Sequence, residues 1–368
     1  MIKQKVLVWV YRLVLGGEPE YLLLRRPPAK DSVWQPVTGG VREGEPLLAA
    51  ASRELAEETG IGAGGAHFRA GGDRKMLGRI LPQTISYGFT DSKGRRFVET
   101  VFARCAPEDA PIVLSREHVH GRWFSRQQAM ARLRWDGQRD ALGLLDRQLS
   151  RLYAGLDISL SPPAGPAVAL LDGTGRLVAW ANMRQDLQTL RWLPTTTVLA
   201  AVNAPLTLPF GMGRCCLEPK PACQCKPVGG EGGRQADRLL MRQGISRAVD
   251  LGPDSPRKPW ILRALELGDL LKRRRISALE VCALASRRRL LGQRVGGRQP
   301  RSRMELQRAL AQLIPGMPTP SEELLEPGEL DAVTCAYVAW LHGQGRSEWL
   351  GDPAEGAIAV PVRVESRV

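Results

Sequence analysis

The segment that most constrains this chain runs from Gly39 to Ile61 and reads GGVREGEPLLAAASRELAEETGI. Pro46 suits the first turn of a helix and Gly60 suits the position just past its end, so we predict a helix over about residues 46–59. Three carboxylates on this helix stand at i, i+3 and i+4, which places them on one face: Glu54, Glu57 and Glu58. Apolar residues are left to face a core, namely Leu47, Ala51 and Leu55.

The spacing of these glutamates points to a cation. Like charges this close repel one another unless a positive ion joins them, and oxygen-only ligands suit Mg²⁺ or Mn²⁺, which share their coordination with phosphate. Gly39 and Gly40 let the backbone before the helix approach such a phosphate closely. Arg53 is expected to hold Glu45 across the loop rather than to touch substrate. The alternative is a solvated acidic helix face, the usual state of a run of glutamates.

With these positions filled in register, the segment resembles the Nudix box. The preceding Trp34-Gln35 pair and the later Trp135–Leu142 segment are similar to the branch of that superfamily that includes dihydroneopterin triphosphate and dATP pyrophosphohydrolases. The resemblance implies an α/β fold, the Nudix α/β/α sandwich with a mixed sheet, over residues 1–150. It also implies Mg²⁺- or Mn²⁺-dependent hydrolysis of a diphosphate linkage in a nucleoside diphosphate derivative, with Glu57 and Glu58 as metal ligands and Glu54 as ligand or base.

Further residues in the first half are candidates for the same site. Glu117 resembles the late acidic segment of many Nudix enzymes, which implies a role at the metal or as the base. Arg25 and Arg26 follow a strand-like run, and they either meet phosphate or remain solvated. The strands expected in this half are Val6–Leu15, Tyr21–Leu24, Thr84–Thr90 and Arg96–Ala106.

The length and net charge of the chain limit its domain organisation and its classes of partner. A chain of 368 residues is too long for one ordinary core, so we expect two domains, residues 1–150 and 151–368. The net charge of +14 favours polyanionic partners, nucleotides or nucleic acid, although an arginine-rich composition also arises from genomic bias. The Val6–Leu15 run is interrupted by Arg12 and lacks a cleavage site, so we expect a cytoplasmic protein with no membrane partner. The oligomeric state stays open.

The second half alternates strand-like and helical runs, which indicates another α/β sheet domain. Its motifs occur in the order Gly155-Leu156-Asp157, Asn203-Ala204-Pro205-Leu206, Leu279-Glu280-Val281, Leu330-Asp331-Ala332 and Leu350-Gly351-Asp352-Pro353. This order resembles a family of predicted RNase H-like nucleases and spans about residues 152–362. The resemblance implies Mg²⁺ ligands at Asp157, Glu280 and Asp331. Asn203 departs from the family, which usually has aspartate there, and a neutral amide binds Mg²⁺ more weakly.

Two other features of this half bear on ligands. Four cysteines cluster in one loop and are either ligands of a structural Zn²⁺ or free or redox-active thiols: Cys215, Cys216, Cys223 and Cys225. Adjacent cysteines are not the usual knuckle spacing. The densest basic region flanks Glu280 and either lines a groove for nucleic acid or is solvated; it comprises Lys272–Arg275, Arg287–Arg289, Arg294, Arg298, Arg301 and Arg303.

Two functions therefore stay open. The first is a Mg²⁺-dependent nucleotide pyrophosphohydrolase joined to a metal-dependent nuclease domain. The second is a nucleotide-sensing and nucleic-acid-binding protein in which one or both catalytic sites are inactive. The complete glutamate motif favours catalysis in the first half, whereas Asn203 favours binding in the second.

Overall fold

The computed structural model describes residues 2–14, 17–62, 80–107, 110–158, 166–182, 193–218, 223–226, 233–246, 249, 252, 255–292 and 299–363. The chain forms two compact units, one of Met1–Arg151 with Pro194–Thr196 and the other of Leu152–Leu193 with Thr197–Val368. Some residues of the expected strands and of the basic region lie outside the described residues: Leu15, Arg294 and Arg298.

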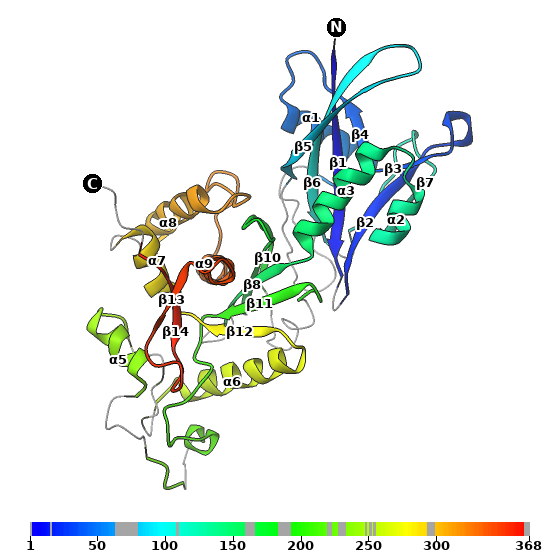
Figure 1. Cartoon of the computed structure of the whole chain (residues 1–368). Helices are drawn as coiled ribbons and strands as arrows, with labels where there is room; N and C mark the ends of the chain where they lie inside the picture. The colour runs from blue at the N-terminus through cyan, green and yellow to red at the C-terminus, as the bar shows by residue number, and fades with distance from the viewer. Residues whose placement is uncertain are drawn as a thin grey trace. The chain divides into compact units, whose positions relative to one another are not determined.

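The first unit is built on a seven-stranded mixed sheet (Figure 1). Its strands are β1 (Lys3–Leu13), β2 (Pro19–Arg25), β3 (Trp34–Gln35), β4 (Val37–Gly40), β5 (Ile80–Thr90), β6 (Arg96–Ala106) and β7 (His120–Ser125). The main order is β3-β2-β1-β6-β5, with β4 paired to β1 and β7 paired to β2. The β1–β6 pair is parallel, and the other pairs are antiparallel.

Helices cover both faces of this sheet because alternate residues of β1 point to opposite sides. On one face, Val6, Val8 and Val10 of β1 share a buried cluster with Ala51 and Leu55 of α1 (Leu47–Thr59). On the other, Trp9 meets Tyr21 edge to face, and the Tyr21 hydroxyl donates to Asp146 of α3 (Asp136–Leu149) at 2.8 Å. The described residues of the unit also form α2 (Arg126–Arg132) and the 3₁₀ turn η1 (Pro28–Lys30).

The second unit contains a five-stranded mixed sheet in the order β10-β9-β8-β11-β12. The strands are β8 (Leu152–Asp157), β9 (Ala167–Leu171), β10 (Leu177–Asn182), β11 (Thr197–Val202) and β12 (Ser277–Glu280). β8, β9 and β10 form an antiparallel meander, and β8, β11 and β12 run parallel. Helix α9 (Pro327–Gly343) packs on β8 so closely that a Cβ at Gly155 would lie 1.9 Å from the Ala332 carbonyl oxygen.

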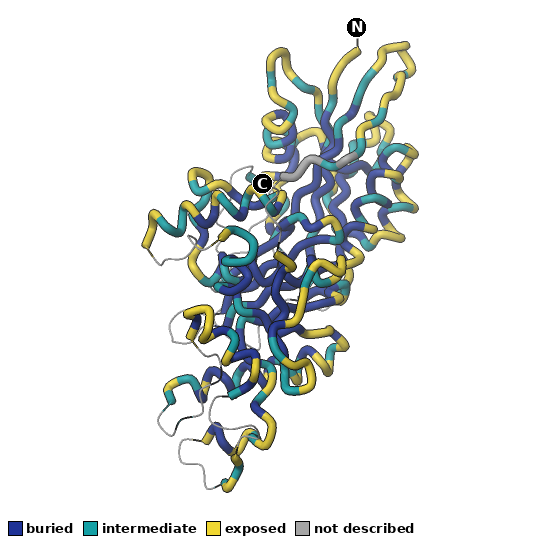
Figure 2. The backbone as a smooth tube through the Cα atoms, turned by 60° about the vertical axis from the view of Figure 1, so that its left-hand side comes forward, coloured by how far each residue is buried: buried dark blue, intermediate teal, exposed yellow. Residues whose placement is uncertain are grey.

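Elsewhere in this unit, the described residues form η2 (Arg214–Leu217), α5 (Gln235–Arg242), α6 (Lys258–Arg273), α7 (Ala283–Leu291), α8 (Pro300–Leu313) and the hairpin of β13 (Ser347–Leu350) and β14 (Ile358–Pro361). Helix α9 begins at Pro327, where Glu326 and Glu329 form a capping box. Buried segments are dark blue in Figure 2, and strands β1, β2, β8, β9 and β10 are mostly buried. No helix among the described residues is long and apolar enough to cross a membrane.

Candidate functional site

Helix α1 has clear local signals at both ends. Pro46 is the N-cap, with extended backbone angles, and the helix ends at Thr59, as the sequence predicts. Gly60 adopts a φ of 71°, the left-handed conformation that favours glycine, and its N–H bonds to the Ala56 carbonyl oxygen. A Cβ at Gly60 would lie 2.9 Å from Cβ of Val113, so glycine also makes room for the following loop.

Arg53 lies at the centre of the glutamate site and bonds through every N–H of its guanidinium. Nε and Nη2 donate to the two oxygens of Glu45 at 2.9 and 2.8 Å, and Nη2 also donates to the Gly40 carbonyl oxygen at 2.9 Å. Nη1 donates to Glu54 at 2.7 Å and to Glu57 at 3.3 Å. Arg53 therefore fixes the loop and two of the three glutamates, as a planar five-donor fork can.

Glu45 is held as a carboxylate. The hydrogen bonds from Arg53 and the backbone N–H of Arg42 lower the pKa of Glu45 from 4.5 to about 2. The Arg42 side chain reaches Glu57 at 3.4 Å, so the loop supplies a second cation to the acidic face. Sequence reasoning missed Arg42 because one arginine in a loop carries no distinctive pattern.

Glu58 differs from its neighbours because it is buried. Only 7% of Glu58 is exposed, and its Oε2 has no hydrogen-bond partner among the described residues. Burial, reinforced by the charge of Glu54, raises the pKa of Glu58 from 4.5 to about 8. A buried carboxylate oxygen without a partner is costly unless a cation satisfies it. The chemistry of these glutamates therefore fits a hard divalent cation.

Glu117 is brought to the same region by the loop that follows β6. This loop is fastened to the end of α1, since Val113 N–H donates to the Thr59 carbonyl at 2.8 Å and Ser115 N–H donates to the Glu58 carbonyl at 3.4 Å. Glu117 is close enough for its charge to raise the pKa of Glu58. Its carboxylate is exposed and meets Lys30 at 3.4 Å.

The two glycines before α1 have different surroundings. A Cβ at Gly39 would lie 1.8 Å from Cδ of Glu54, so the Glu54 side chain occupies the space that glycine leaves. A Cβ at Gly40 would have nothing within 4 Å, so Gly40 faces open space. Arg25 bonds through Nε to Ser32 Oγ at 3.2 Å and stacks over Trp34, whereas Arg26 adds charge near His118.

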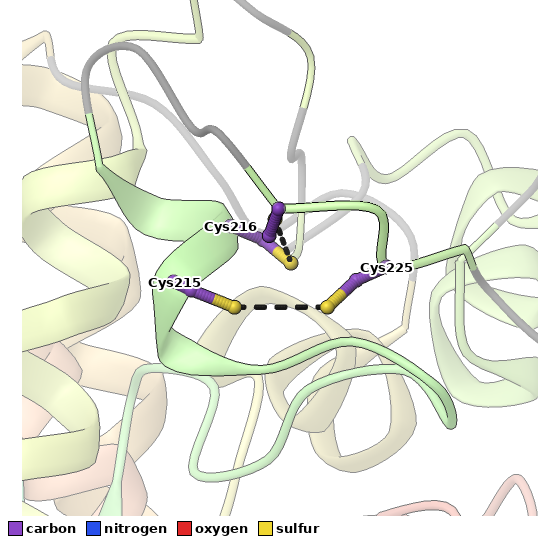
Figure 3. A group of neighbouring side chains, drawn as sticks. Cys215, Cys216 and Cys225 are labelled. Carbon is purple, nitrogen blue, oxygen red and sulfur yellow. Dashed lines mark hydrogen bonds between the residues drawn. The ribbon is translucent and has the colours of Figure 1, made fainter.

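The four clustered cysteines of the second unit converge, and Figure 3 labels three of them, Cys215, Cys216 and Cys225. Their sulfur atoms all lie within 4.8 Å of one another, with 3.6 Å between Cys215 and Cys225 and 3.6 Å between Cys216 and Cys223. Among the described residues, this is the one group of three or more potential His, Cys, Asp or Glu ligands with atoms close enough to hold a metal ion. Such a cluster can hold zinc.

The second unit brings together some of its predicted carboxylates. Asp157 ends β8, and its Oδ1 accepts a 2.7 Å hydrogen bond from Nδ2 of Asn203, which follows β11. Burial raises the pKa of Asp157 to about 6, opposed by Asn203 and by the charge of Arg287. Arg287 also forms an ion pair with Asp331 of α9. Asp157 and Asp331 thus both interact with Arg287, and Asn203 joins this group through its hydrogen bond to Asp157.

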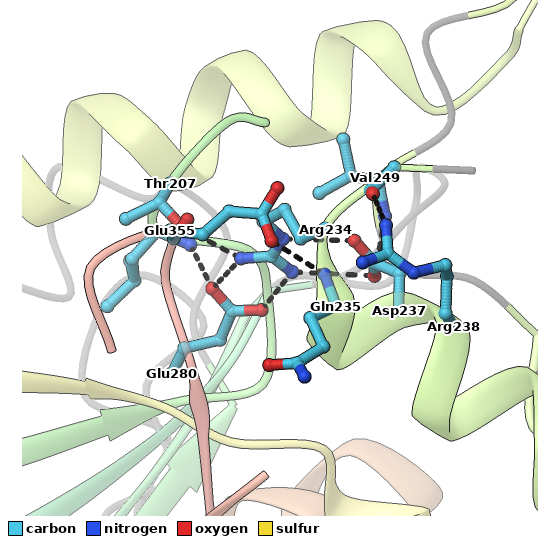
Figure 4. Close-up of polar contacts among 10 residues, drawn as sticks. Thr207, Arg234, Gln235, Asp237, Arg238, Val249, Glu280 and Glu355 are labelled. Atoms are coloured by element: carbon cyan, nitrogen blue, oxygen red, sulfur yellow. Dashed lines mark hydrogen bonds and ion pairs between the residues drawn. The ribbon is translucent and has the colours of Figure 1, made fainter. Parts of the chain in front are cut away.

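Glu280 is engaged elsewhere (Figure 4). Its two oxygens accept hydrogen bonds from Arg234 at 2.5 and 2.6 Å, and Leu206 N–H adds another at 2.8 Å. Arg234 is fully buried and also pairs with the buried Asp237 at 2.9 Å. Burial alone would lower the pKa of Arg234, but the charges and hydrogen bonds of Glu280 and Asp237 raise it. Sequence reasoning did not find Arg234.

The basic region is largely paired within its own unit. Arg289 meets Glu348, Arg303 meets Glu326 at 2.9 Å, and Arg301 meets Glu305 at 3.3 Å. Arg274 donates to the Leu193 carbonyl oxygen at 2.8 Å. These contacts favour a structural role for much of the region, with Arg294 and Arg298 outside the described residues.

Comparison with known proteins identifies the first unit. Residues 4–145 match the model of the NUDIX domain, so the chain carries an N-terminal Nudix fold with a mixed sheet. A Nudix domain suggests pyrophosphohydrolase activity, implies a nucleotide substrate and typically uses a divalent metal. The second unit is a mixed α/β sheet domain of unassigned fold, and nothing in the comparisons identifies it as RNase H-like.

The chain is also similar to individual proteins. It is 33% identical over 129 residues to an octanoyltransferase of Myxococcus xanthus, covering 34% of this chain and 32% of that protein. This chain therefore spans about a third of the length of that relative. Among solved structures, the dihydroneopterin triphosphate pyrophosphohydrolase of E. coli matches at 26% identity and a TM-score of 0.32, covering 39% of this chain and 96% of that one. An Ap4A hydrolase complex of C. elegans matches at 23% identity and a TM-score of 0.31, covering 39% and 95%.

Proposed function

We propose that the first unit, residues 1–150, hydrolyses a diphosphate linkage in a nucleoside diphosphate derivative and depends on Mg²⁺ or Mn²⁺. The observation that carries this proposal is the unpartnered buried oxygen of Glu58 in the same acidic segment as Glu54 and Glu57. A solvated acidic face would leave all three glutamates in water, yet Glu58 is buried. The NUDIX match over residues 4–145 supports the same reading.

Each residue of the site has a distinct proposed role. Glu57 and Glu58 would hold the metal, and Glu54 would be a further ligand or the base. A divalent ion held there would neutralise charge on the diphosphate and lower the pKa of a bound water. Arg53 positions Glu54 and Glu57 rather than touching substrate, because its donors are already used.

The surrounding loops would complete the site. Glu117 is an exposed carboxylate near Glu58, so it can act at the metal or as the base. Gly40 faces open space, which allows phosphate to approach the backbone. Arg25 and Arg26 remain candidates for phosphate contact at the end of β2.

The test is hydrolysis by the full chain with Mg²⁺ and a panel of nucleoside triphosphates, dinucleoside polyphosphates, nucleotide sugars and dihydroneopterin triphosphate. The Glu57→Gln variant should lower kcat at least roughly 100-fold, since even partners of metal ligands contribute up to about that much. The matched control is Glu43→Gln, which changes an exposed carboxylate of the same loop and should leave kcat within twofold.

Cleavage at a diphosphate that Glu57→Gln abolishes and Glu43→Gln retains would support the enzyme and name its substrate class. Tight binding of one panel member with no cleavage would reject catalysis and favour the competing function, a nucleotide sensor.

For the second unit, residues 151–368, we propose a metal-dependent nuclease or nucleic-acid-binding domain. The favouring observation is that Asp157 and Asn203 meet at the carboxyl ends of the neighbouring parallel strands β8 and β11, where α/β sheets commonly bind ligands. Asp331 forms an ion pair with Arg287, which also interacts with Asp157. Glu280 instead forms an ion pair with Arg234. Among the candidate Mg²⁺ ligands, Glu280 is therefore the least available.

This second proposal is tested with single-stranded and duplex oligonucleotides in Mg²⁺ or Mn²⁺, comparing the full chain with Asp157→Asn and Asp331→Asn. Cleavage lost in both variants would support a nuclease. Binding without cleavage would leave the nucleic-acid-binding function, and neither cleavage nor binding would reject both.

A further inference from the structure

We infer that Cys215, Cys216, Cys223 and Cys225 bind one structural Zn²⁺. Four sulfur ligands form a closed coordination sphere with no position left for water or substrate, which is the mark of a structural rather than a catalytic zinc site. The site lies in the second unit and is independent of the hydrolysis proposed for the first.

The distances fit tetrahedral coordination. A Zn–S bond of about 2.3 Å places the sulfurs of a tetrahedral site about 3.8 Å apart. The observed separations are 3.6 Å for two pairs, and all four sulfurs lie within 4.8 Å of one another. A covalent S–S bond of about 2.05 Å is much shorter, so these contacts are not disulfides.

The local backbone explains how adjacent cysteines can both serve as ligands. Cys215 and Cys216 lie in the 3₁₀ turn η2, while Cys223 and Cys225 come from a second short segment. In Figure 3 the labelled sulfurs point toward one another from these two segments. The unusual Cys-Cys spacing therefore does not prevent four-fold ligation, because the tight turn lets both side chains reach the same point.

Burial argues against a purely apolar cluster. Cys216 is buried and Cys215 is exposed, so contact with Cys225 does not remove the Cys215 thiol from water. Apolar packing does not explain why exposed and buried thiols converge. A shared metal ion explains it, because the ion binds all four sulfur atoms.

The turn that holds Cys215 and Cys216 is fastened directly to helix α6. Arg214, next to Cys215, pairs with Asp269 of α6, and Lys258 Nζ donates to the Glu218 carbonyl at 3.3 Å on the other side of η2. Zinc would thus link this anchored turn to the segment that holds Cys223 and Cys225.

The test is the zinc content of the full chain, produced with zinc and purified in excess Mg²⁺ so that carboxylate sites hold magnesium. We expect about one Zn²⁺ per chain in the wild type. The zinc content of the Cys215→Ser/Cys225→Ser variant should be at least tenfold lower than that of the wild type. The control Cys282→Ser should keep it, because Cys282 is the N-cap of α7, where serine is favoured.

A second readout needs no variant. Mapping of thiol alkylation by mass spectrometry should find these four cysteines protected until a chelator is added, and Co²⁺ replacement should give the visible bands of a tetrahedral thiolate centre. Zinc-free wild type that has four reactive thiols, or two disulfides, would overturn the inference. Equal zinc in the double variant and the wild type would overturn it as well.

Discussion

The acidic groups of the two units differ in what already satisfies them. In the first unit, Arg53 binds Glu54 and Glu57 but leaves one oxygen of the buried Glu58 without a partner. In the second unit, both carboxylate oxygens of Glu280 accept hydrogen bonds from Arg234. The number of carboxylates near a sheet is therefore a poor guide to a metal site. What matters is whether the protein's own cations have left an acceptor free.

The largest expected effect would come from breaking the Arg234 network. Arg234→Met leaves Glu280 and Asp237 buried without their cation, so we expect the second unit to lose about 3–5 kcal/mol of stability. The loss is measured by urea unfolding, monitored through the hydrogen exchange of backbone amides in β11 and β12. The control Arg238→Met changes an exposed neighbour on α5 and should cost less than about 0.5 kcal/mol. Equal losses of stability in the two variants would show that the buried Arg234 contributes no more to stability than the exposed Arg238.

The next effect concerns pH and Glu58. Its folded pKa, about 8, lies above its ordinary value of 4.5, so its contribution to stability is complete below about pH 4.5 and is lost as pH rises through about 8. Metal-free wild type should therefore lose on the order of 4 kcal/mol more than Glu58→Gln between about pH 5 and about pH 9. Thermal unfolding in a chelator measures the difference, and identical pH profiles would contradict it.

The smallest expected effect is a difference in kinetics between alanine substitutions at the two loop glycines, Gly39 and Gly40. Gly39→Ala places a methyl group on the Glu54 side chain, so we expect a roughly tenfold lower kcat from the displaced carboxylate. Gly40→Ala meets open space, so it should raise KM with kcat unchanged if phosphate approaches there. Steady-state kinetics distinguish the two. The same loss of kcat in both variants would reject separate roles.

Local patterns predicted much of the fold. The bounds of β6 match the expected run Arg96–Ala106, and α1 ends before Gly60 as its C-cap signal indicates. The start of α9 also carries a local signal, since Pro327 follows a glutamate with another glutamate at the capping-box spacing. Such signals act over a few residues, where sequence reasoning is strongest.

The site was less predictable because its decisive contacts join distant residues. Glu57 and Glu58 are neighbours in sequence, yet the Glu57 side chain is 52% exposed whereas Glu58 is buried beneath a loop some 55 residues later. The pairing of Glu280 with Arg234 spans 46 residues and has no motif. Burial and long-range pairing depend on the finished fold, and the sequence alone does not reveal them.

The use of all five Arg53 donors also sets how much substitution position 53 tolerates. Lysine keeps the charge but offers three donors around a single point, so it cannot bridge Glu45, Glu54 and the Gly40 carbonyl together. In a library of all substitutions selected for activity, position 53 should accept arginine alone, whereas exposed Glu43 in the same loop should accept many residues.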